Sequence, residues 1–247
     1  DKPDLNLPGR QQEILELAVN SGKPVVLILL SGSALAVNWA EKHVPAIIQG
    51  WYPGAEGGRI LAETLFGDIN PEGHLPVTFY KGTEELPAFT DYAMEGRTYR
   101  YMKQDALYPF GYGLSYTTYA YSNLTVRGEQ VGEDGTDITV TVKNTGKRTG
   151  TETVQVYIKI EKEDTPNAQL KAIRKVTLRP GEEKEVNIHL AKDAFGLCDK
   201  EGNFRTCKGE AKVYVGGQAP DRRSEELTGV KVQSVTLHTE DELLWEN

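Results

Sequence analysis

The hydrophobic pattern changes partway along this chain, and that change constrains the fold more than any other feature. Residues 25–30 and 44–48 are short apolar runs, and segments with helical spacing lie around them. Apolar runs without polar alternation, separated by helices, are typical of a parallel sheet covered on both faces. From about residue 119, apolar and polar residues alternate in short stretches, as in an antiparallel sandwich. The sequence therefore predicts an α/β domain followed by an all-β domain.

The α/β domain is expected to occupy residues 1–82. The pattern predicts a helix around 14–19, a strand at 25–30 buried on both faces, a helix at 34–42, a strand at 44–48, a helix at 59–66 and a third strand near 75–80. A doubly wound sheet of only three strands would have unpaired edges and poorly covered faces. We therefore expect an incomplete sandwich domain, with further strands upstream of Asp1.

The all-β domain is expected to occupy residues 119–247. Turn signals at intervals of about 8–12 residues separate seven expected strands, at 122–126, 137–143, 152–160, 171–178, 185–190, 211–215 and 230–237. An immunoglobulin-like or fibronectin-type sandwich fits this number of short strands best. Residues 83–118 form an interdomain segment of little periodicity, and residues 83–121 hold eight of the twelve tyrosines. So aromatic a segment is expected to pack between the two domains.

Charge and hydropathy exclude several classes of function. The formal net charge is −8, which disfavours binding to nucleic acid and to anionic membranes. No apolar run approaches the roughly 20 residues that cross a bilayer. The four histidines are scattered without metal-ligand spacing, so no metal and no cofactor is predicted. Location stays open between cytoplasm, periplasm and secretion.

Three motifs carry weaker signals. The glycine-rich residues 54–58 before a helix could present amide groups to an anion, but a tight turn is the stronger interpretation because no phosphate-loop spacing is present. Ser31 and Ser33 follow an apolar run, and helix capping suits them better than a nucleophile role. Cys198 and Cys207 flank a turn that could bring them together, and the sequence leaves a disulfide or two free thiols open.

The segment 94–101 holds the candidate site residues, Glu95, Arg97, Tyr99 and Arg100. Guanidinium groups and aromatic rings at this density suit sugar hydroxyls and a pyranose face, and they suit an interdomain interface equally well. Glu95 could act as an acid. Glycoside hydrolysis needs two carboxyl groups that flank the bond, and no second one can be placed beside Glu95.

Several ordered blocks resemble one known family. They are Leu5-Asn-Leu-Pro8, Gly32-Ser33 with Trp39-Ala40, Gly50-Trp-Tyr-Pro-Gly54 with Gly57-Gly58, Leu65-Phe-Gly-Asp68 with Gly73-His-Leu-Pro76, Gly96-Arg-Thr-Tyr-Arg-Tyr101 and Tyr108-Pro-Phe-Gly-Tyr-Gly-Leu-Ser-Tyr116. Together they resemble the C-terminal half of glycoside hydrolase family 3, in the branch of β-xylosidases and β-glucosidases. The part from about residue 119 resembles that family's fibronectin type III-like domain. The resemblance covers essentially the whole chain.

The resemblance implies an exo-acting, retaining β-glycosidase that hydrolyses terminal β-D-glucosides or β-D-xylosides. In that family the Asp nucleophile lies in a (β/α)8 barrel, and the acid/base Glu lies shortly before the stretch that Asp1-Lys2 and Leu5-Asn-Leu-Pro8 match, with Lys2 in place of Arg. Neither catalytic carboxylate is therefore expected in this chain, which alone would be inactive. The implied partners are the N-terminal barrel half, joined covalently or as a second chain, and an oligosaccharide or aryl glycoside. Arg97, Tyr99 and Arg100 would hold the tyrosine-rich segment against the barrel or near substrate.

Two other functions stay open at this point. A non-catalytic carbohydrate-binding or interaction module would bind glycans without turnover, and a small nucleotide-binding α/β protein would respond to nucleotide. The sequence leaves open the sugar, the linkage preference, the relation of the upstream half to this chain, and the oligomeric state, including a homo-oligomer.

Overall fold

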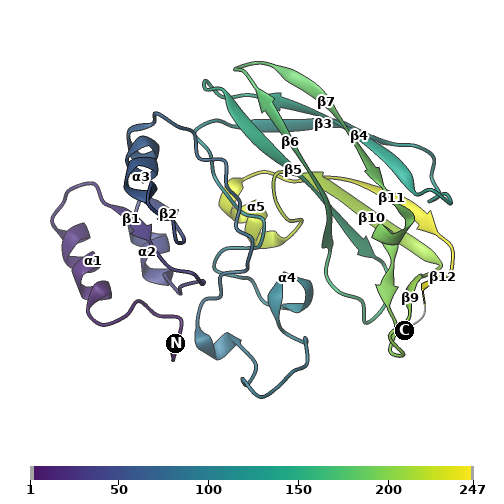
Figure 1. The fold of residues 1–247 in the computed structure, drawn as a ribbon, viewed down its shortest axis with the longest axis horizontal. Helices are drawn as coiled ribbons and strands as arrows, with labels where there is room; N and C mark the ends of the chain where they lie inside the picture. The colour runs from purple at the N-terminus through teal and green to yellow at the C-terminus, as the bar shows by residue number, and fades with distance from the viewer. Residues whose placement is uncertain (1–2, 246–247) are drawn as a thin grey trace.

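The structure, a computed structural model, describes residues 3–245. An α/β part and a β sandwich lie at opposite ends of the molecule, and residues 83–118 run between them (Figure 1). Mixed helix and strand in the first part followed by antiparallel sheets confirms the expected fold class.

The α/β part is built on two parallel strands. Strands β1 (Val26–Leu29) and β2 (Ala46–Gln49) pair in the register Val26↔Ala46. Around them lie α1 (Gln11–Asn20), α2 (Asn38–His43) and α3 (Gly57–Phe66) (Figure 1). Helix α3 ends at Gly67, whose φ of 79° is a left-handed conformation that glycine adopts without strain. A small core forms where Leu15, Leu29, Val37, Ala40 and Phe79 meet.

The third strand that was expected near residues 75–80 is not present, and that expectation was wrong. This stretch pairs instead with the interdomain segment: the Phe79 amide donates to the Tyr108 carbonyl at 2.9 Å, and the Leu75 amide donates to the Tyr112 carbonyl at 2.8 Å. Pro76 has no amide hydrogen for a ladder, and only the isolated bridge Phe79↔Tyr108 forms. Residues 75–80 thus tie the α/β part to the interdomain segment.

Two finer expectations for the α/β part were also wrong. Strand β1 is not buried on both faces, because Val26 and Leu30 are exposed and β1 pairs only with β2 among the described residues. Helix α2 begins at Asn38 and not at residue 34, because the Ala36 amide donates to the Leu5 carbonyl at 2.8 Å and holds residues before it in an extended connection.

The sandwich contains all seven expected strands, with ends that differ by up to three residues. They are β3 (Tyr119–Val126), β4 (Thr136–Asn144), β5 (Gly150–Ile160), β6 (Gln169–Leu178), β7 (Glu183–Leu190), β10 (Gly209–Gly216) and β11 (Gln233–Thr239). One antiparallel sheet has the order β11-β10-β5-β6 and the facing sheet has the order β3-β4-β7. Alternate residues from both, such as Val140, Val156, Ile188 and Val213, form the main core.

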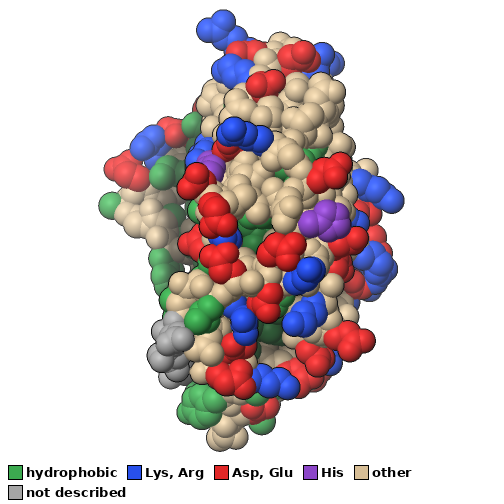
Figure 2. Space-filling view, turned by 90° about the vertical axis from the view of Figure 1, so that its right-hand side faces the viewer, with side chains coloured by type: hydrophobic (Ala, Val, Ile, Leu, Met, Phe, Trp, Pro, Cys, Tyr) green, Lys and Arg blue, Asp and Glu red, His purple; other side chains and the backbone are tan. Residues whose placement is uncertain are grey.

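Shorter elements complete the sandwich. Strands β8 (Leu197–Cys198), β9 (Phe204–Thr206) and β12 (Glu242–Trp245) form a small sheet at its far end, after the 3-10 turn η2 (Lys192–Phe195). Helix α5 (Arg222–Thr228) lies between β10 and β11 in sequence, and its N-cap Asp221 accepts a hydrogen bond from the Ser224 amide at 2.8 Å. The end of the molecule that carries the small sheet shows acidic and basic side chains intermixed over its surface (Figure 2).

The connection between the two parts holds two short helical turns, η1 (Thr83–Glu85) and α4 (Thr98–Tyr101). Within residues 3–245, no helix has both the length and the apolar character that crossing a bilayer requires.

Candidate functional site

The carboxyl ends of β1 and β2 form one edge of the parallel sheet, where ligands bind in open α/β folds. At this edge the Gln49 amide nitrogen donates to the Ser31 carbonyl at 3.0 Å, while the Gln49 amide oxygen is buried without a partner among the described residues. Trp51 has a left-handed φ of 53° and meets Phe79 edge to face at 6.2 Å. After this turn the side chain of Tyr52 lies on the surface against Gly32, and Tyr52 is 80% exposed.

The serines at this edge do not cap α2. Its N-cap is Val37, which makes no side-chain cap bond, so the capping role expected for Ser31 and Ser33 was wrong. The Ser31 hydroxyl instead donates to the Ser33 carbonyl at 2.8 Å and so closes a local turn. In the glycine-rich run, the Pro53 ring packs over Gly57 with no room for a Cβ there, which supports the tight-turn interpretation.

Large exposed apolar side chains are concentrated in the α/β part and in the loop that follows it. They are Ile14, Leu17, Val26, Leu30, Tyr52, Ile60, Leu65, Phe66, Ile69, Val77, Phe89, Tyr92 and Met94. Scattered apolar residues are normal on a protein surface, but rings as exposed as Phe66, Phe89 and Tyr92 are typical of surfaces that another structure covers. The sandwich has far fewer such side chains.

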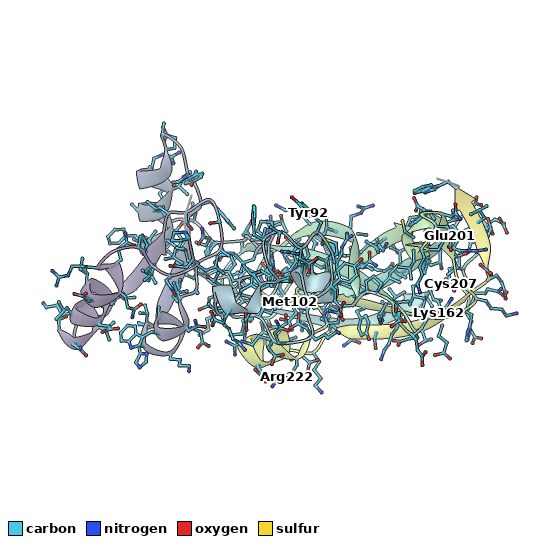
Figure 3. The ribbon with its side chains drawn as sticks, turned by 90° about the horizontal axis from the view of Figure 1, so that it is seen from below. Tyr92, Met102, Lys162, Glu201, Cys207 and Arg222 are labelled. Carbon is cyan, nitrogen blue, oxygen red and sulfur yellow. The ribbon has the colours of Figure 1, made fainter. Side chains whose placement is uncertain are left out.

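Arg97 organises the loop that carries Phe89 and Tyr92. Its guanidinium donates to the carbonyl oxygens of Ala88 at 3.1 Å, Asp91 at 2.6 Å and Ala93 at 3.1 Å. A planar fork with several donors suits this convergence of carbonyl groups, which a lysine could not reproduce. The loop therefore holds its shape while the Tyr92 ring points away from the chain (Figure 3).

The other three predicted site residues lie in different surroundings. Glu95 is exposed and forms an ion pair with Lys103 at 3.1 Å. Arg100 is exposed, with its guanidinium 6.0 Å from the centre of the Tyr99 ring. Tyr99 itself faces the sandwich, and its hydroxyl accepts a hydrogen bond from the Leu170 amide at 3.2 Å. The structure thus brings Tyr99 and Arg100 together and leaves Glu95 and Arg97 on the neighbouring loop.

An aromatic stack joins the interdomain segment to the sandwich, and the sequence pattern did not reveal it. The rings of Tyr99 and Phe110 are parallel at 4.1 Å, and both meet the ring of Tyr157 edge to face. Tyr157 lies on the outer face of β5, away from the core, and it is fully buried. The segment therefore covers the middle of the outer face of the four-stranded sheet, around Tyr157 of β5.

A polar network lies beside this stack. The Gln155 amide nitrogen donates to the carbonyls of Gly111 and Gly217, each at 2.9 Å, and its oxygen accepts from the Tyr157 hydroxyl at 2.6 Å. The Nδ1 atom of His74 lies 2.8 Å from the Gly111 carbonyl oxygen, and burial lowers the pKa of this histidine. A neutral imidazole donating from Nδ1 fits these contacts. Residues from both parts of the chain are therefore joined by buried hydrogen bonds.

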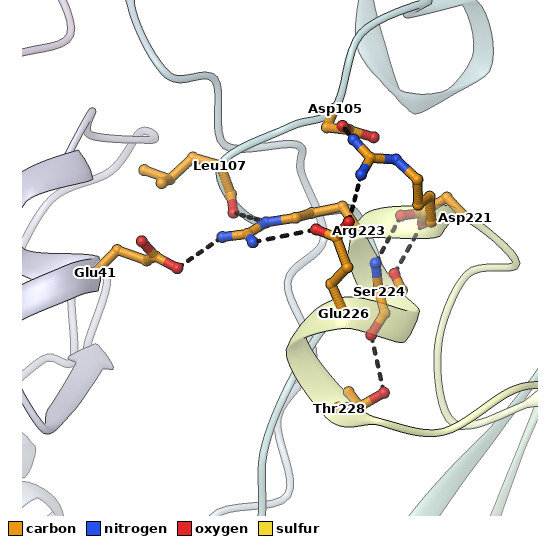
Figure 4. A network of polar contacts seen from close by, with 9 residues as sticks. Glu41, Asp105, Leu107, Asp221, Arg223, Ser224, Glu226 and Thr228 are labelled. Carbon is orange, nitrogen blue, oxygen red and sulfur yellow. Dashed lines mark hydrogen bonds and ion pairs between the residues drawn. The ribbon is translucent and has the colours of Figure 1, made fainter.

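A second network connects α5 to the α/β part (Figure 4). Arg223 forms a half-buried ion pair with Glu41 of α2 at 2.8 Å, and its Nε donates to the Leu107 carbonyl at 3.3 Å. The neighbouring Arg222 is more exposed and pairs with Asp105 and Glu226. Three segments far apart in sequence meet at Arg223.

Glu152, on β5, is a buried carboxyl group. Burial raises its pKa to about 7, although the Tyr121 hydroxyl donates to Oε1 at 2.7 Å and opposes that shift. A Cβ at Gly217 would collide with the same oxygen, so the backbone closes over the carboxyl group. No sequence signal marked this glutamate. Glu152 lies on the same face of β5 as the core residues Val154 and Val156. Because it is close to the start of the strand, where polar residues are common, the alternation did not identify it as buried.

The described residues show no group of three or more metal-ligating side chains, and both cysteines are free thiols. In the pairing of β8 with β9, Cys198 lies opposite Phe204, so Cys207 lies beyond the end of the register. A disulfide between them does not form.

Two family models match the chain. The model of the glycosyl hydrolase family 3 C-terminal domain matches residues 1–116, and that of a fibronectin type III-like domain matches residues 152–219. The chain is 40% identical over 232 residues to a xylan 1,4-beta-xylosidase of Xylanibacter ruminicola, which covers 92% of this chain and 26% of that protein. It is 34% identical over 230 residues to a periplasmic beta-glucosidase of Salmonella typhimurium, covering 87% of this chain and 30% of that protein.

Solved structures of beta-glucosidases superpose on this chain. Beta-glucosidase 3B from Thermotoga neapolitana, solved with alpha-D-glucose, superposes with a TM-score of 0.84 at 30% identity, covering 99% of this chain and 36% of that one. The beta-glucosidase from Listeria innocua with glucose gives 0.81 at 29% identity, covering 98% and 34%. The chain spans about a quarter to a third of the length of the curated relatives it matches.

Proposed function

The chain belongs to glycoside hydrolase family 3, and from that membership we propose that it is the C-terminal portion of an exo-acting, retaining β-glycosidase that removes terminal β-D-glucosyl or β-D-xylosyl residues. The observation that carries the proposal is the 40% identity to a xylan 1,4-beta-xylosidase over 92% of the chain. The similarity to beta-glucosidases keeps both sugars in the proposal.

In this proposal the reaction is a double displacement by two carboxyl groups supplied upstream of the chain. An aspartate attacks the anomeric carbon while a glutamate protonates the departing oxygen, and water activated by the same glutamate then releases the sugar. Glu95 is exposed and paired with Lys103, and in this proposal it belongs to the rim and not to the reacting bond.

The chain's own contribution is a wall of the cleft and a supporting domain. The half-exposed strands β1 and β2, the projecting Tyr52 and Phe66, and the loop with Phe89 and Tyr92 form the surface that an N-terminal barrel would cover. Arg97 positions that loop through three carbonyl groups. Tyr99 lies behind it and anchors the segment to the sandwich, and the backbone carbonyl of Arg100 accepts a hydrogen bond from the Asn167 amide at 2.7 Å. In this proposal residues 1–82 are the C-terminal part of the α/β sandwich domain, residues 83–118 are the interdomain segment, and residues 119–247 are the fibronectin type III-like domain.

The test compares the full-length polypeptide with residues 1–247 alone, using release of p-nitrophenol from its β-glucoside and β-xyloside. We expect turnover by the full-length protein only, with the faster substrate naming the sugar. Turnover by residues 1–247 alone would contradict the placement of both catalytic carboxylates upstream, and absence of turnover by the full-length protein on either substrate would contradict the proposal as a whole.

Arg97→Ala tests the positioning role in the full-length protein. We expect a lower kcat/KM, because the loop loses the three hydrogen bonds that shape it, while Arg100→Ala serves as the matched control with an exposed guanidinium. Equal kinetics and equal stability for Arg97→Ala and wild type would count against this role.

A further inference from the structure

Helix α4 is a single turn whose conformation depends on contacts from outside it. It spans only the four residues Thr98–Tyr101, and so short a helix is not stable by itself. Its first residue, Thr98, has a left-handed φ of 55°, which a β-branched residue adopts only where the surroundings enforce it. The Thr98 amide donates to the Tyr80 hydroxyl at 2.7 Å, which fixes this end of the turn.

Asn167 holds the other end of α4 with its side-chain and backbone N–H groups. Its side-chain nitrogen donates to the carbonyl oxygens of Tyr99 at 2.9 Å and Met102 at 2.8 Å, and its backbone amide donates to the Arg100 carbonyl at 2.7 Å. These carbonyl groups belong to the C-terminal end of the turn, where a helix leaves its acceptors without partners. Asn167 lies in residues 161–168, the hairpin loop between β5 and β6, so the sandwich supplies the C-terminal cap of α4.

Lys159, near the end of β5, gives this hairpin loop a fixed shape. Its ammonium group donates to the Thr165 hydroxyl at 2.8 Å and to the carbonyl oxygens of Thr165 at 3.2 Å and Pro166 at 2.7 Å. The Thr165 hydroxyl in turn donates to the Ile160 carbonyl at 2.9 Å. Strand β5 is an inner strand that pairs with both β10 and β6, so the loop starts from a strongly constrained part of the sandwich. Asn167 therefore contacts α4 from an ordered support.

The contacts continue from α4 into the exposed loop. Arg97, which directly precedes α4, holds residues 88–93 through three carbonyl groups, and these residues carry the exposed rings of Phe89 and Tyr92. A displacement of α4 moves Arg97, and with it the point from which the guanidinium reaches those carbonyl groups. We propose that Asn167 is a positioning residue, through which the sandwich sets the place of residues 88–97 in the wall of the cleft. That these residues border the cleft rests on the proposed function.

The consequence is a defect in substrate binding and not in the chemical step. In the proposed function both reacting carboxylates are supplied upstream, whereas Phe89 and Tyr92 offer aromatic rings that suit the C–H face of a sugar. A displaced loop therefore raises KM and leaves kcat close to that of the wild type. A loss of folded protein would instead lower the apparent kcat and leave KM unchanged, so the two causes can be distinguished by kinetics.

The experiment compares the full-length wild type with Asn167→Ala, Asn167→Asp and Asn187→Ala, using the p-nitrophenyl β-glucoside and β-xyloside. Asn167→Asp keeps the size of the side chain but has no side-chain N–H, and Asn187→Ala is the matched control because Asn187 is exposed on β7 of the other sheet. Thermal unfolding shows whether each variant is folded. Hydrogen exchange, followed by mass spectrometry, reports on residues 88–101 independently of activity, because the amides of Asp91 and Arg97 are hydrogen-bonded within the loop.

We expect both Asn167 variants to exchange faster than the wild type over residues 88–101 and to have a KM about five-fold higher at nearly unchanged kcat, with Asn187→Ala equal to the wild type. In a double variant with Arg97→Ala the two effects should not add, because both act on one loop. Unchanged exchange in a folded Asn167→Ala, faster exchange with an unchanged KM, or additive effects overturn the proposal. A wild type without turnover contradicts the proposed function instead, and faster exchange in Asn167→Ala then still supports the role of Asn167 in holding α4.

Discussion

The buried carboxyl group of Glu152 makes the stability of this protein depend on pH in a direction opposite to that of most carboxylates. Burial raises its pKa from 4.5 to about 7, so the folded state holds this proton more tightly than the unfolded chain does. Between pH 4.5 and 7 the folded state therefore binds more protons. The contribution of Glu152 to stability therefore falls as pH rises through this range, because deprotonation leaves a charge in a site closed by Tyr121 and Gly217.

The magnitude follows from the pKa difference between the folded and unfolded states. A rise in pKa from 4.5 to about 7 corresponds to about 3 kcal/mol, present as a benefit below the unfolded pKa and lost by about pH 8. Glu152→Gln keeps the shape and keeps an oxygen that accepts from the Tyr121 hydroxyl, but it has no charge to bury. The variant is therefore expected to gain about 3 kcal/mol relative to wild type between pH 4.5 and pH 8.

The assay is urea unfolding of the full-length polypeptide at closely spaced pH values, followed by a signal from the sandwich, for wild type and Glu152→Gln. Glu185→Gln is the matched control, because its side chain is exposed on β7 of the same sandwich. Glu185→Gln is expected to follow the pH dependence of the wild type. A stability difference between wild type and Glu152→Gln that stays constant from pH 4.5 to 8 would refute the reasoning.

Three further predictions concern the joint between the two parts. Gly111→Ala should lower stability by about 2 kcal/mol, because Gly111 has a left-handed φ of 79° and a Cβ would strike Gln155 and Tyr157; unchanged urea midpoints would contradict this. Arg223→Met should cost about 2 kcal/mol by leaving the half-buried Glu41 unpaired, whereas the exposed Arg222→Met should cost under about 1 kcal/mol, measured by the same unfolding assay. Tyr99→Ala should cost about 2 kcal/mol and increase proteolysis of the interdomain segment, and Tyr99→Phe, which keeps the ring stack and loses only the acceptor for the Leu170 amide, should cost about 1 kcal/mol.

The strands of the sandwich could be predicted from the sequence because each has one face in the core. In β4, Ile138, Val140 and Val142 alternate with polar residues, and the period of two is visible without knowing the partner strand. The strands that were missed, β8, β9 and β12, have four residues or fewer and pack at the end of the sandwich, where alternation is too short to be distinguished from a loop.

The joint could not be predicted, because its contacts depend on which surfaces meet. Tyr157 is an outward-facing residue of β5 by pattern, and only the arrival of Tyr99 and Phe110 buries it. The stretch around Phe79 has a strand-like sequence, yet it pairs with residues of the tyrosine-rich segment in place of the parallel sheet. For the same reason, the sequence identified Arg97 and Tyr99 as notable residues without distinguishing a loop organiser from an anchor on the sandwich.

The covered middle of the outer face of the four-stranded sheet has a consequence for protein engineering. A transplant that takes the sandwich from residue 119 onward into another scaffold would uncover Tyr157, Gln155 and the rim of β10 together, and would create a sticky, unsatisfied surface. The smallest portable unit therefore begins before α4, so that Tyr99 and Phe110 travel with the strands they cover. The boundary at which the sandwich can be separated from the α/β part therefore lies inside the interdomain segment and not at its end.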